Sequence, residues 1–272
     1  MPTKRQIVWD ILYPFVFILL CIVIASVAGI IIAGVVTGQR GTDPDVLIKT
    51  VPHMTLLITL AAYVIALAAQ YRVLKNDRLR LGVPERKWGA AGIVFACIMC
   101  VCAAFLWSSL IEVSGLQEIF TLYTSVAEAS FEGQNIFLLI LTTVIVGPVC
   151  EEVIFRVMVF RRARHYMSLV PAMLISSVLF GVYHLNMIQL IYAFGLGMLF
   201  SWMYEKSGTI LLPVLIHMGA NLLAVFSVPL QDAAGRLTGA DGAAAACVIL
   251  AAAGAVSLVI LIILIKKRRR TE

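Results

Sequence analysis

The run that decides the fold is NIFLLILTTVIVGPVCEEVIFRVMVF, residues Asn135–Phe160. Its first part, Ile136–Val149, carries no charge. The whole run is long enough for a transmembrane helix, which needs about 17–25 predominantly apolar residues. Glu151, Glu152 and Arg156 nevertheless lie inside it. A carboxylate at membrane depth costs about 2.5–3.5 kcal/mol on insertion scales. Two adjacent glutamates here therefore require partners and indicate a function.

The composition of the whole chain is that of an integral membrane protein. Of its 272 residues, 61% are hydrophobic and 13% are charged, and the mean hydropathy is +0.99. Soluble domains carry about 25% charged residues. We therefore predict an all-α, polytopic membrane helix bundle that forms a single transmembrane domain over residues 1–272. About eight apolar runs are long enough to cross a bilayer: Ile11–Val36, Val51–Ala68, Trp88–Leu110, Asn135–Phe160, Leu169–Leu185, Met187–Tyr204, Thr209–Leu230 and Ala243–Ile265.

The distribution of positive charge predicts the orientation. The connections that alternate along the chain hold most of the lysines and arginines, namely Lys4, Arg5, Arg72, Lys75, Arg78, Arg80, Arg86, Lys87, Arg161, Arg162, Arg164, Lys206 and Lys266–Arg270. The opposite connections hold Arg40, Lys49 and Arg236. Loops rich in Lys and Arg stay in the cytoplasm, so both termini are predicted to be cytoplasmic. This asymmetry and contact with anionic lipid explain the net charge of +6 without a nucleic-acid partner.

The charged residues of the fourth run differ in what can neutralise them. Residues four apart on a helix share a face, whereas neighbours point about 100° apart. Glu152 and Arg156 can therefore pair within their helix, in the favourable order with the acid first. Glu151 lacks such a partner, so we expect another helix to supply it, with His184 and His217 as candidates. We interpret Glu151 as the working carboxylate and Glu152 as the more structural one.

Two later runs place further polar side chains at membrane depth. Phe180 and His184 are four apart in the fifth run, and His217 and Asn221 are four apart in the seventh. Each pair can therefore aim at one point. At about 1.5 Å of rise per residue, and within the uncertainty of the helix ends, these groups can meet the glutamates between the bilayer midplane and the cytoplasmic face.

Two prolines adjoin the polar clusters. Pro148 precedes the glutamates, and Pro213 lies one turn before His217. Proline removes a backbone hydrogen bond and kinks a helix. In membranes, such breaks are tolerated where the backbone lines a protein-enclosed or watery cavity. We therefore predict a membrane-embedded polar cavity beside these residues.

In this order on late spans, Glu151-Glu152-x-x-x-Arg156, Phe180-x-x-x-His184 and His217-x-x-x-Asn221 resemble the motifs of the CAAX protease and bacteriocin-processing family, also called CPBP or Abi. That family includes the type II CAAX prenyl endopeptidases. The motif-bearing protease core is placed at about residues 135–230. The resemblance implies an eight-helix bundle with a conical cavity open to cytoplasm and membrane, and endoproteolysis within or beside the bilayer. The expected location is a bacterial plasma membrane.

The resemblance also implies roles for the candidate catalytic residues. Glu151 would be the general base that activates a water molecule, and His184 would help to hold and polarise that water. His217 and Asn221 would donate hydrogen bonds to the tetrahedral oxyanion. Arg156 would orient and neutralise the second glutamate of the doublet.

Zinc is the alternative to a metal-free site. Glu151, His184 and His217 could hold a zinc ion and leave one position open for water. The histidines lie in different helices, however, and the chain has no His-Glu-x-x-His pair. We therefore prefer a glutamate-activated water without a cofactor.

The expected partners are the lipid bilayer and a membrane-anchored peptide or protein substrate. The substrate would be a prenylated CAAX-like carboxy terminus or a peptide or bacteriocin precursor. Two other functions remain open at this point. Intramembrane Glu, His and Arg would equally suit a proton- or cation-coupled transporter, although no internal repeat is evident. The third reading is a catalytically silent immunity or regulatory membrane protein.

Overall fold

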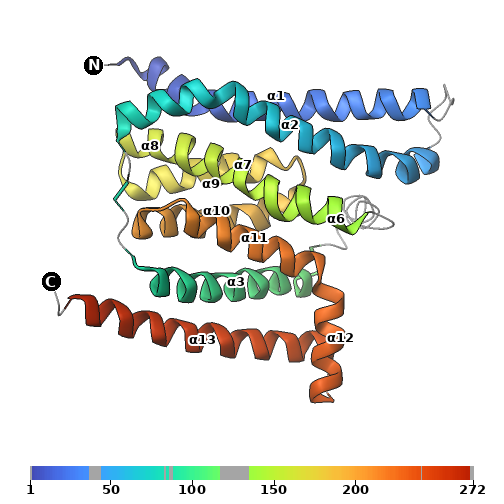
Figure 1. Cartoon of the computed structure of the whole chain (residues 1–272), viewed down its shortest axis with the longest axis vertical. Coiled ribbons are helices and arrows are strands. Elements are labelled where there is room, and N and C mark those ends of the chain that lie inside the picture. The colour runs from blue at the N-terminus through green and yellow to red at the C-terminus, as the bar shows by residue number, and fades with distance from the viewer. Residues whose placement is uncertain are drawn as a thin grey trace.

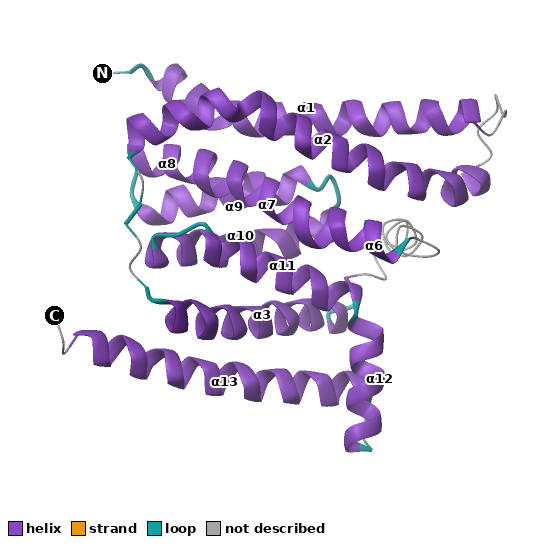
Figure 2. Cartoon of the chain, in the orientation of Figure 1, coloured by secondary structure: helices purple, strands orange, loops and turns teal. Residues whose placement is uncertain are grey.

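The computed structural model describes residues 2–36, 44–82, 84–85, 88–116, 135–239 and 241–269. Within these ranges every regular element is a helix, and no strand occurs (Figure 2). The predicted all-α class is therefore confirmed.

The helices follow the apolar runs of the sequence. Their bounds are α1 Lys4–Val36, α2 Pro44–Leu81, α3 Ala90–Val113, α6 Ile136–Leu139, η1 Ile140–Val146, α7 Gly147–Glu152, η2 Val153–Phe160, α8 Arg161–Tyr166, α9 Leu169–Tyr183, α10 Met187–Ser207, α11 Leu211–Val225, α12 Ser227–Thr238 and α13 Gly242–Arg269. The elements from α6 to α8 form one long apolar helix, Ile136–Tyr166.

The number of membrane crossings differs from the prediction. Among the described residues, 6 helices are long and apolar enough to cross a bilayer, or up to 7 if α11 and α12, which meet at 72°, form one span. α9 is apolar but has 15 residues, a length of about 22 Å against a hydrocarbon core of about 30 Å. The membrane class of the chain is confirmed, whereas the count of eight crossings is not.

The helix that carries the glutamate doublet alternates between α- and π-type hydrogen bonding and changes type four times. α7 lies between two π-helical segments, η1 and η2, and π turns within α-helices are frequent at functional sites. The N–H of Gly147 donates to the carbonyl of Thr142, five residues back. A Cβ at Gly147 would lie 2.9 Å from that carbonyl oxygen and 3.4 Å from the ring of Tyr63. The break predicted at Pro148 is thus a switch of helix type, and glycine lets α2 approach there.

The helices lie side by side in an elongated bundle (Figure 1). α1 and α2 form one edge, α3 and α13 form the other, and α9, α10, α11 and the Ile136–Tyr166 helix lie between them. Both chain ends lie at one end of this bundle, which we call the terminal end, around Lys4 and Arg269. The opposite end, around Val36, Ile136 and α12, is called the far end. The shared position of the termini agrees with their predicted placement on one side of the membrane, and the cytoplasmic assignment stays a prediction.

A network of ion pairs and hydrogen bonds connects α1, α2 and α8 at the terminal end. Arg162 of α8 is 4% exposed, and its Nε lies 2.7 Å from Oδ2 of Asp77 on α2. Its Nη1 donates to the backbone carbonyl of Asp10 on α1 at 2.6 Å. Arg80 and Tyr166 also contact the Asp10 carboxylate, at 3.0 and 2.9 Å. Each buried charge therefore has opposite charges or hydrogen-bond partners, as burial in low dielectric requires.

Candidate active site

The second glutamate of the doublet is held by a buried arginine. Glu152 and Arg156 are both 0% exposed, and Arg156 Nε lies 3.0 Å from Glu152 Oε2. The predicted pairing between positions four apart is therefore confirmed. Arg156 Nη1 also donates to the hydroxyl of Ser176 on α9 at 3.0 Å. Its guanidinium carbon lies 4.9 and 5.5 Å from the ring centroids of Phe180 and Phe200, so two aromatic faces stabilise this cation.

The first glutamate finds a partner that sequence reasoning missed. The hydroxyl of Tyr63, on α2, donates to Glu151 Oε1 at 2.6 Å. The hydroxyl of Tyr183, on α9, donates in turn to the Tyr63 oxygen at 3.1 Å. A tyrosine within an apolar span usually finds a hydrogen-bond partner for its hydroxyl. The sequence could therefore have indicated that Tyr63 has a partner, but not that the partner is Glu151.

His217 lies between the two glutamates. Its Nδ1 is 3.1 Å from Glu152 Oε1, and its Nε2 is 3.7 Å from Glu151 Oε2. The imidazole stacks on the ring of Phe200 with a centroid distance of 5.1 Å. His217 is thus one of the expected interhelical partners of Glu151. Both of its ring nitrogens face carboxylates, whereas the sequence prediction considered the histidine mainly as an oxyanion donor.

Asn221 and His184 approach the site from the remaining helices. The side-chain amide of Asn221 donates to the backbone carbonyl of Thr143 at 2.8 Å. His184 caps the C-terminus of α9, and its ring packs against Phe180 and Tyr183 with centroid distances of 5.2 Å each. Its expected pairing with Glu151 is not seen, since the described histidine that faces the Glu151 carboxylate is His217. His184 reaches the same cavity without touching the carboxylate.

A cavity is present beside these groups, as predicted, and its lining combines polar with apolar side chains. It has a volume of about 350 Å³ and is lined by Leu56, Thr59, Tyr63, Thr142, Thr143, Gly147, Glu151, Phe180, His184, Gln189, Tyr192, Ala193, Leu196, His217, Asn221, Ala224 and Val225. Four of the six candidate residues therefore share one space. The other two, Glu152 and Arg156, lie behind His217 in the core.

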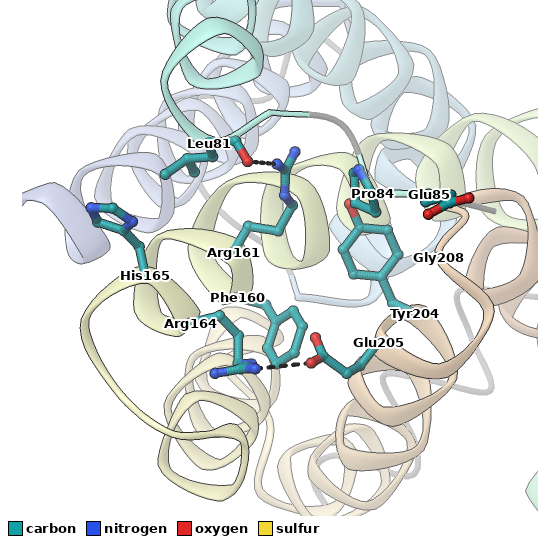
Figure 3. Close-up of a pocket in the computed structure, with 10 residues that line it drawn as sticks. All are labelled: Leu81, Pro84, Glu85, Phe160, Arg161, Arg164, His165, Tyr204, Glu205 and Gly208. Atoms are coloured by element: carbon teal, nitrogen blue, oxygen red, sulfur yellow. Dashed lines mark hydrogen bonds and ion pairs between the residues drawn. The ribbon is translucent and has the colours of Figure 1, made fainter. Parts of the chain in front are cut away.

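A second hollow at the terminal end has its cations already engaged (Figure 3). It has a volume of about 330 Å³ and lies between the end of α2, α8 and α10. Arg161 donates to the carbonyl oxygens of Leu81 and Gly82 at 2.9 and 2.6 Å. Arg164 pairs with Glu205 at 2.9 Å. These contacts join three helix ends, and we interpret the hollow as a structural junction.

The side chains suggested as zinc ligands do not gather around one point. Among the described residues, no group of three or more His, Cys, Asp or Glu side chains is arranged to hold a metal ion. Of the suggested set, Glu151 and His217 approach each other to 3.7 Å. Phe180 packs against both histidine rings, with centroid distances of 5.2 Å to His184 and 5.6 Å to His217. The arrangement does not fit a three-ligand zinc site, and the metal-free mechanism stays a prediction.

Comparison with known proteins finds relatives that share the core bearing the site. Residues 133–223 match the family model of Rce1-like type II CAAX prenyl endopeptidases. The chain is 34% identical over 92 residues to the putative membrane peptidase YdiL of Bacillus subtilis (strain 168), covering 34% of this chain and 38% of that protein. It is 22% identical over 204 residues to the membrane-embedded CAAX protease MroQ of Staphylococcus aureus (strain USA300), covering 71% of this chain and 80% of MroQ. No solved structure matches the chain.

These matches confirm the predicted resemblance to the CAAX protease and bacteriocin-processing family. All six candidate residues lie inside the matched range of 133–223, whereas Tyr63 lies outside it. The match to YdiL spans well under half of that protein.

Proposed function

We propose that this chain, whose residues 133–223 match the CAAX endopeptidase family, is an intramembrane endopeptidase that hydrolyses a peptide bond with a glutamate-activated water. One observation carries the proposal. Glu151 is 5% exposed and lines a polar cavity, and a tyrosine hydroxyl contacts one of its oxygens while a histidine faces the other. A carboxylate fixed in this way beside space for a substrate suits a general base.

In the proposed reaction, a water molecule in the cavity gives a proton to Glu151 as its oxygen attacks the carbonyl carbon of the scissile bond. The tetrahedral intermediate then collapses, and Glu151 returns the proton to the departing amine. The products are a carboxylate and an amine, so water is the sole co-reactant. Tyr63 holds one oxygen of Glu151 throughout, which leaves the other to accept the proton.

Asn221 and His184 are proposed to stabilise the oxyanion. An amide nitrogen carries two N–H donors, so Asn221 can donate one to Thr143 and keep one for the substrate. His184 lines the same cavity. Removal of one oxyanion-hole donor typically costs about 2.7–4 kcal/mol of transition-state stabilisation. We therefore expect both side chains to act on kcat.

Glu152 and Arg156 are proposed to act on the reaction through His217. Glu152 Oε1 lies 3.1 Å from Nδ1 of His217 and fixes the ring, whose Nε2 faces Glu151 Oε2 at 3.7 Å. Arg156 holds Glu152 in turn, with 3.0 Å between Nε and Oε2. A buried charge requires such a partner.

The proposed substrate is a membrane-anchored peptide or protein. A prenylated CAAX peptide is a natural first probe, because MroQ is named as a CAAX protease and the family model describes prenyl endopeptidases. A peptide or bacteriocin precursor is the second probe. The apolar part of either substrate would lie in the bilayer, beside the apolar helices of the protein.

The proposal is tested by cleavage assays on the purified protein in lipid nanodiscs, with a farnesylated CAAX peptide and a panel of single-span peptides. General-base catalysis contributes about 10²–10⁴-fold to rates, so Glu151→Gln should reduce kcat by at least that lower factor. Glu205→Gln is the matched control, because this glutamate pairs with Arg164 at the terminal end. Undiminished cleavage by Glu151→Gln would remove this residue from the mechanism. Glu151-dependent proton or cation flux in liposomes, without cleavage, would favour the transporter reading.

A further inference from the structure

The cavity occupies one half of the bundle. On α11 its lining begins at His217 and continues to Val225, at the far end of the helix. On the Ile136–Tyr166 helix the lining residues precede Glu151, again toward the far end. α10 and α2 contribute residues from the halves that face the same way. In Figure 1, these helix halves lie on the side of α12, opposite both chain ends.

Between Glu151 and the terminal end, packed side chains close the bundle, and the hollows at that end do not reach Glu151. The residues between Glu151 and the terminal end that are at most 1% exposed are Glu152, Ile154, Phe155, Arg156, Met158, Val159, Phe160, Ser176, Ser177, Phe200, Met203, Leu212 and Ile216. They come from four helices, and all of the apolar ones except Met158 belong to one continuous hydrophobic core. Protein interiors are packed as densely as organic crystals. A substrate therefore reaches Glu151 through the far half of the bundle.

The closed end carries most of the positive charge. Lys4, Arg5, Arg72, Lys75, Arg78, Arg80, Arg161, Arg162, Arg164 and Lys206 all belong to the terminal end. At the far end, the described cations are Lys49 in the first turns of α2 and Arg236 in α12. Short loops rich in Lys and Arg remain in the cytoplasm. The charge asymmetry thus assigns the closed end to the cytoplasm and the cavity to the opposite side.

We propose that the active-site cavity is reached from the extracytoplasmic side. Its substrate is then a membrane-anchored peptide or protein whose scissile bond lies at the extracytoplasmic end of its anchor. This inference rests on the proposed endopeptidase function and specifies its substrate class. It differs from the cytoplasm-facing cavity that the family resemblance implies. Cytoplasmic prenylated carboxy termini are accordingly poor substrates of the enzyme in its native membrane.

The side from which the cavity is entered is measured without knowledge of the substrate. Single cysteines are introduced at Val225, which lines the cavity, at Leu237, which is 83% exposed on α12, and at Leu79, which is 78% exposed near the end of α2. A membrane-impermeant maleimide is applied to intact and to permeabilised cells. The labelling of each variant is measured after subtraction of the labelling of the wild-type chain, which has six cysteines of its own. Ser177→Cys, 0% exposed in the closed half, is the matched control for a buried thiol.

We expect Val225→Cys and Leu237→Cys to be labelled in intact cells, and Leu79→Cys to be labelled after permeabilisation alone. Labelling of Leu79→Cys in intact cells would overturn the orientation. Labelling of Val225→Cys after permeabilisation alone, with Leu237→Cys labelled in intact cells, would overturn the route into the cavity. Size-exclusion chromatography and thermal unfolding of the purified variants in detergent show that they are folded.

The position of the scissile bond is measured in the same cells. New protein amino termini in the membrane fraction are compared between cells with the wild-type chain and cells with Glu151→Gln. Termini that disappear in the variant should map to the extracytoplasmic ends of membrane anchors. Termini at cytoplasmic sites would overturn the substrate class. If no terminus changes while Val225→Cys is labelled from outside, the endopeptidase function fails and the accessibility stands.

Discussion

Tyr63→Phe gives the sharpest test of how Glu151 is held. The substitution removes one hydroxyl and keeps the ring that packs beside Gly147. The lost contact is a 2.6 Å hydrogen bond to Glu151 Oε1, at a position where Tyr63 is 7% exposed. Hydrogen bonds to charged groups contribute about 1.5–3 kcal/mol. Since 1.36 kcal/mol corresponds to a tenfold change in rate, kcat should fall by about 10- to 150-fold.

The assay is steady-state cleavage of the probe that wild-type protein cleaves and Glu151→Gln does not. Because the Tyr63 hydroxyl is engaged with the carboxylate, we expect kcat to fall with little change in KM. A residue that merely supported the fold would instead lower the amount of active protein. Size-exclusion and thermal unfolding in detergent therefore accompany the kinetics.

Tyr183→Phe is the matched control. Its hydroxyl donates to the Tyr63 oxygen at 3.1 Å and lies one hydrogen bond further from Glu151. Bonds between neutral groups contribute about 0.5–1.5 kcal/mol, so its effect on kcat should be smaller than that of Tyr63→Phe. Equal and small losses in the two folded variants would refute the positioning role of Tyr63.

Three further predictions concern buried charge and metal. Arg156→Met leaves Glu152 without its ion pair and should lower the free energy of unfolding by about 3–5 kcal/mol. Adding Glu152→Gln should recover part of this loss. Strictly additive losses in the double variant would contradict the pairing. Asp77→Asn weakens the contact to Arg162 at the terminal end and should lower stability by about 1.5–3 kcal/mol while kcat is kept, so a fall in kcat in the folded variant would contradict its structural role. Cleavage should survive thorough chelation, with no stoichiometric zinc by elemental analysis; loss of activity that zinc restores would establish a metalloprotease.

Local spacing predicted those contacts that lie within one helix. Glu152 and Arg156 pair because positions four apart share a helical face, and this holds whatever surrounds them. The cost of burying Glu151 predicted that it must find a partner elsewhere, and His217 supplies one. Spacing could not predict that His217 would contact both glutamates, since that depends on how α11 packs against α7.

The sequence by itself determined the membrane class, the helical fold and the six polar residues of the motifs. Its apolar runs must form helices in lipid because every backbone group there needs an internal partner. The tertiary structure alone decided the role of Tyr63, whose bond to Glu151 joins positions 88 residues apart. It also decided on which side of Glu151 the active-site cavity lies. Both depend on packing between helices. The hydrophobicity of one apolar run does not show which other helices will pack against it.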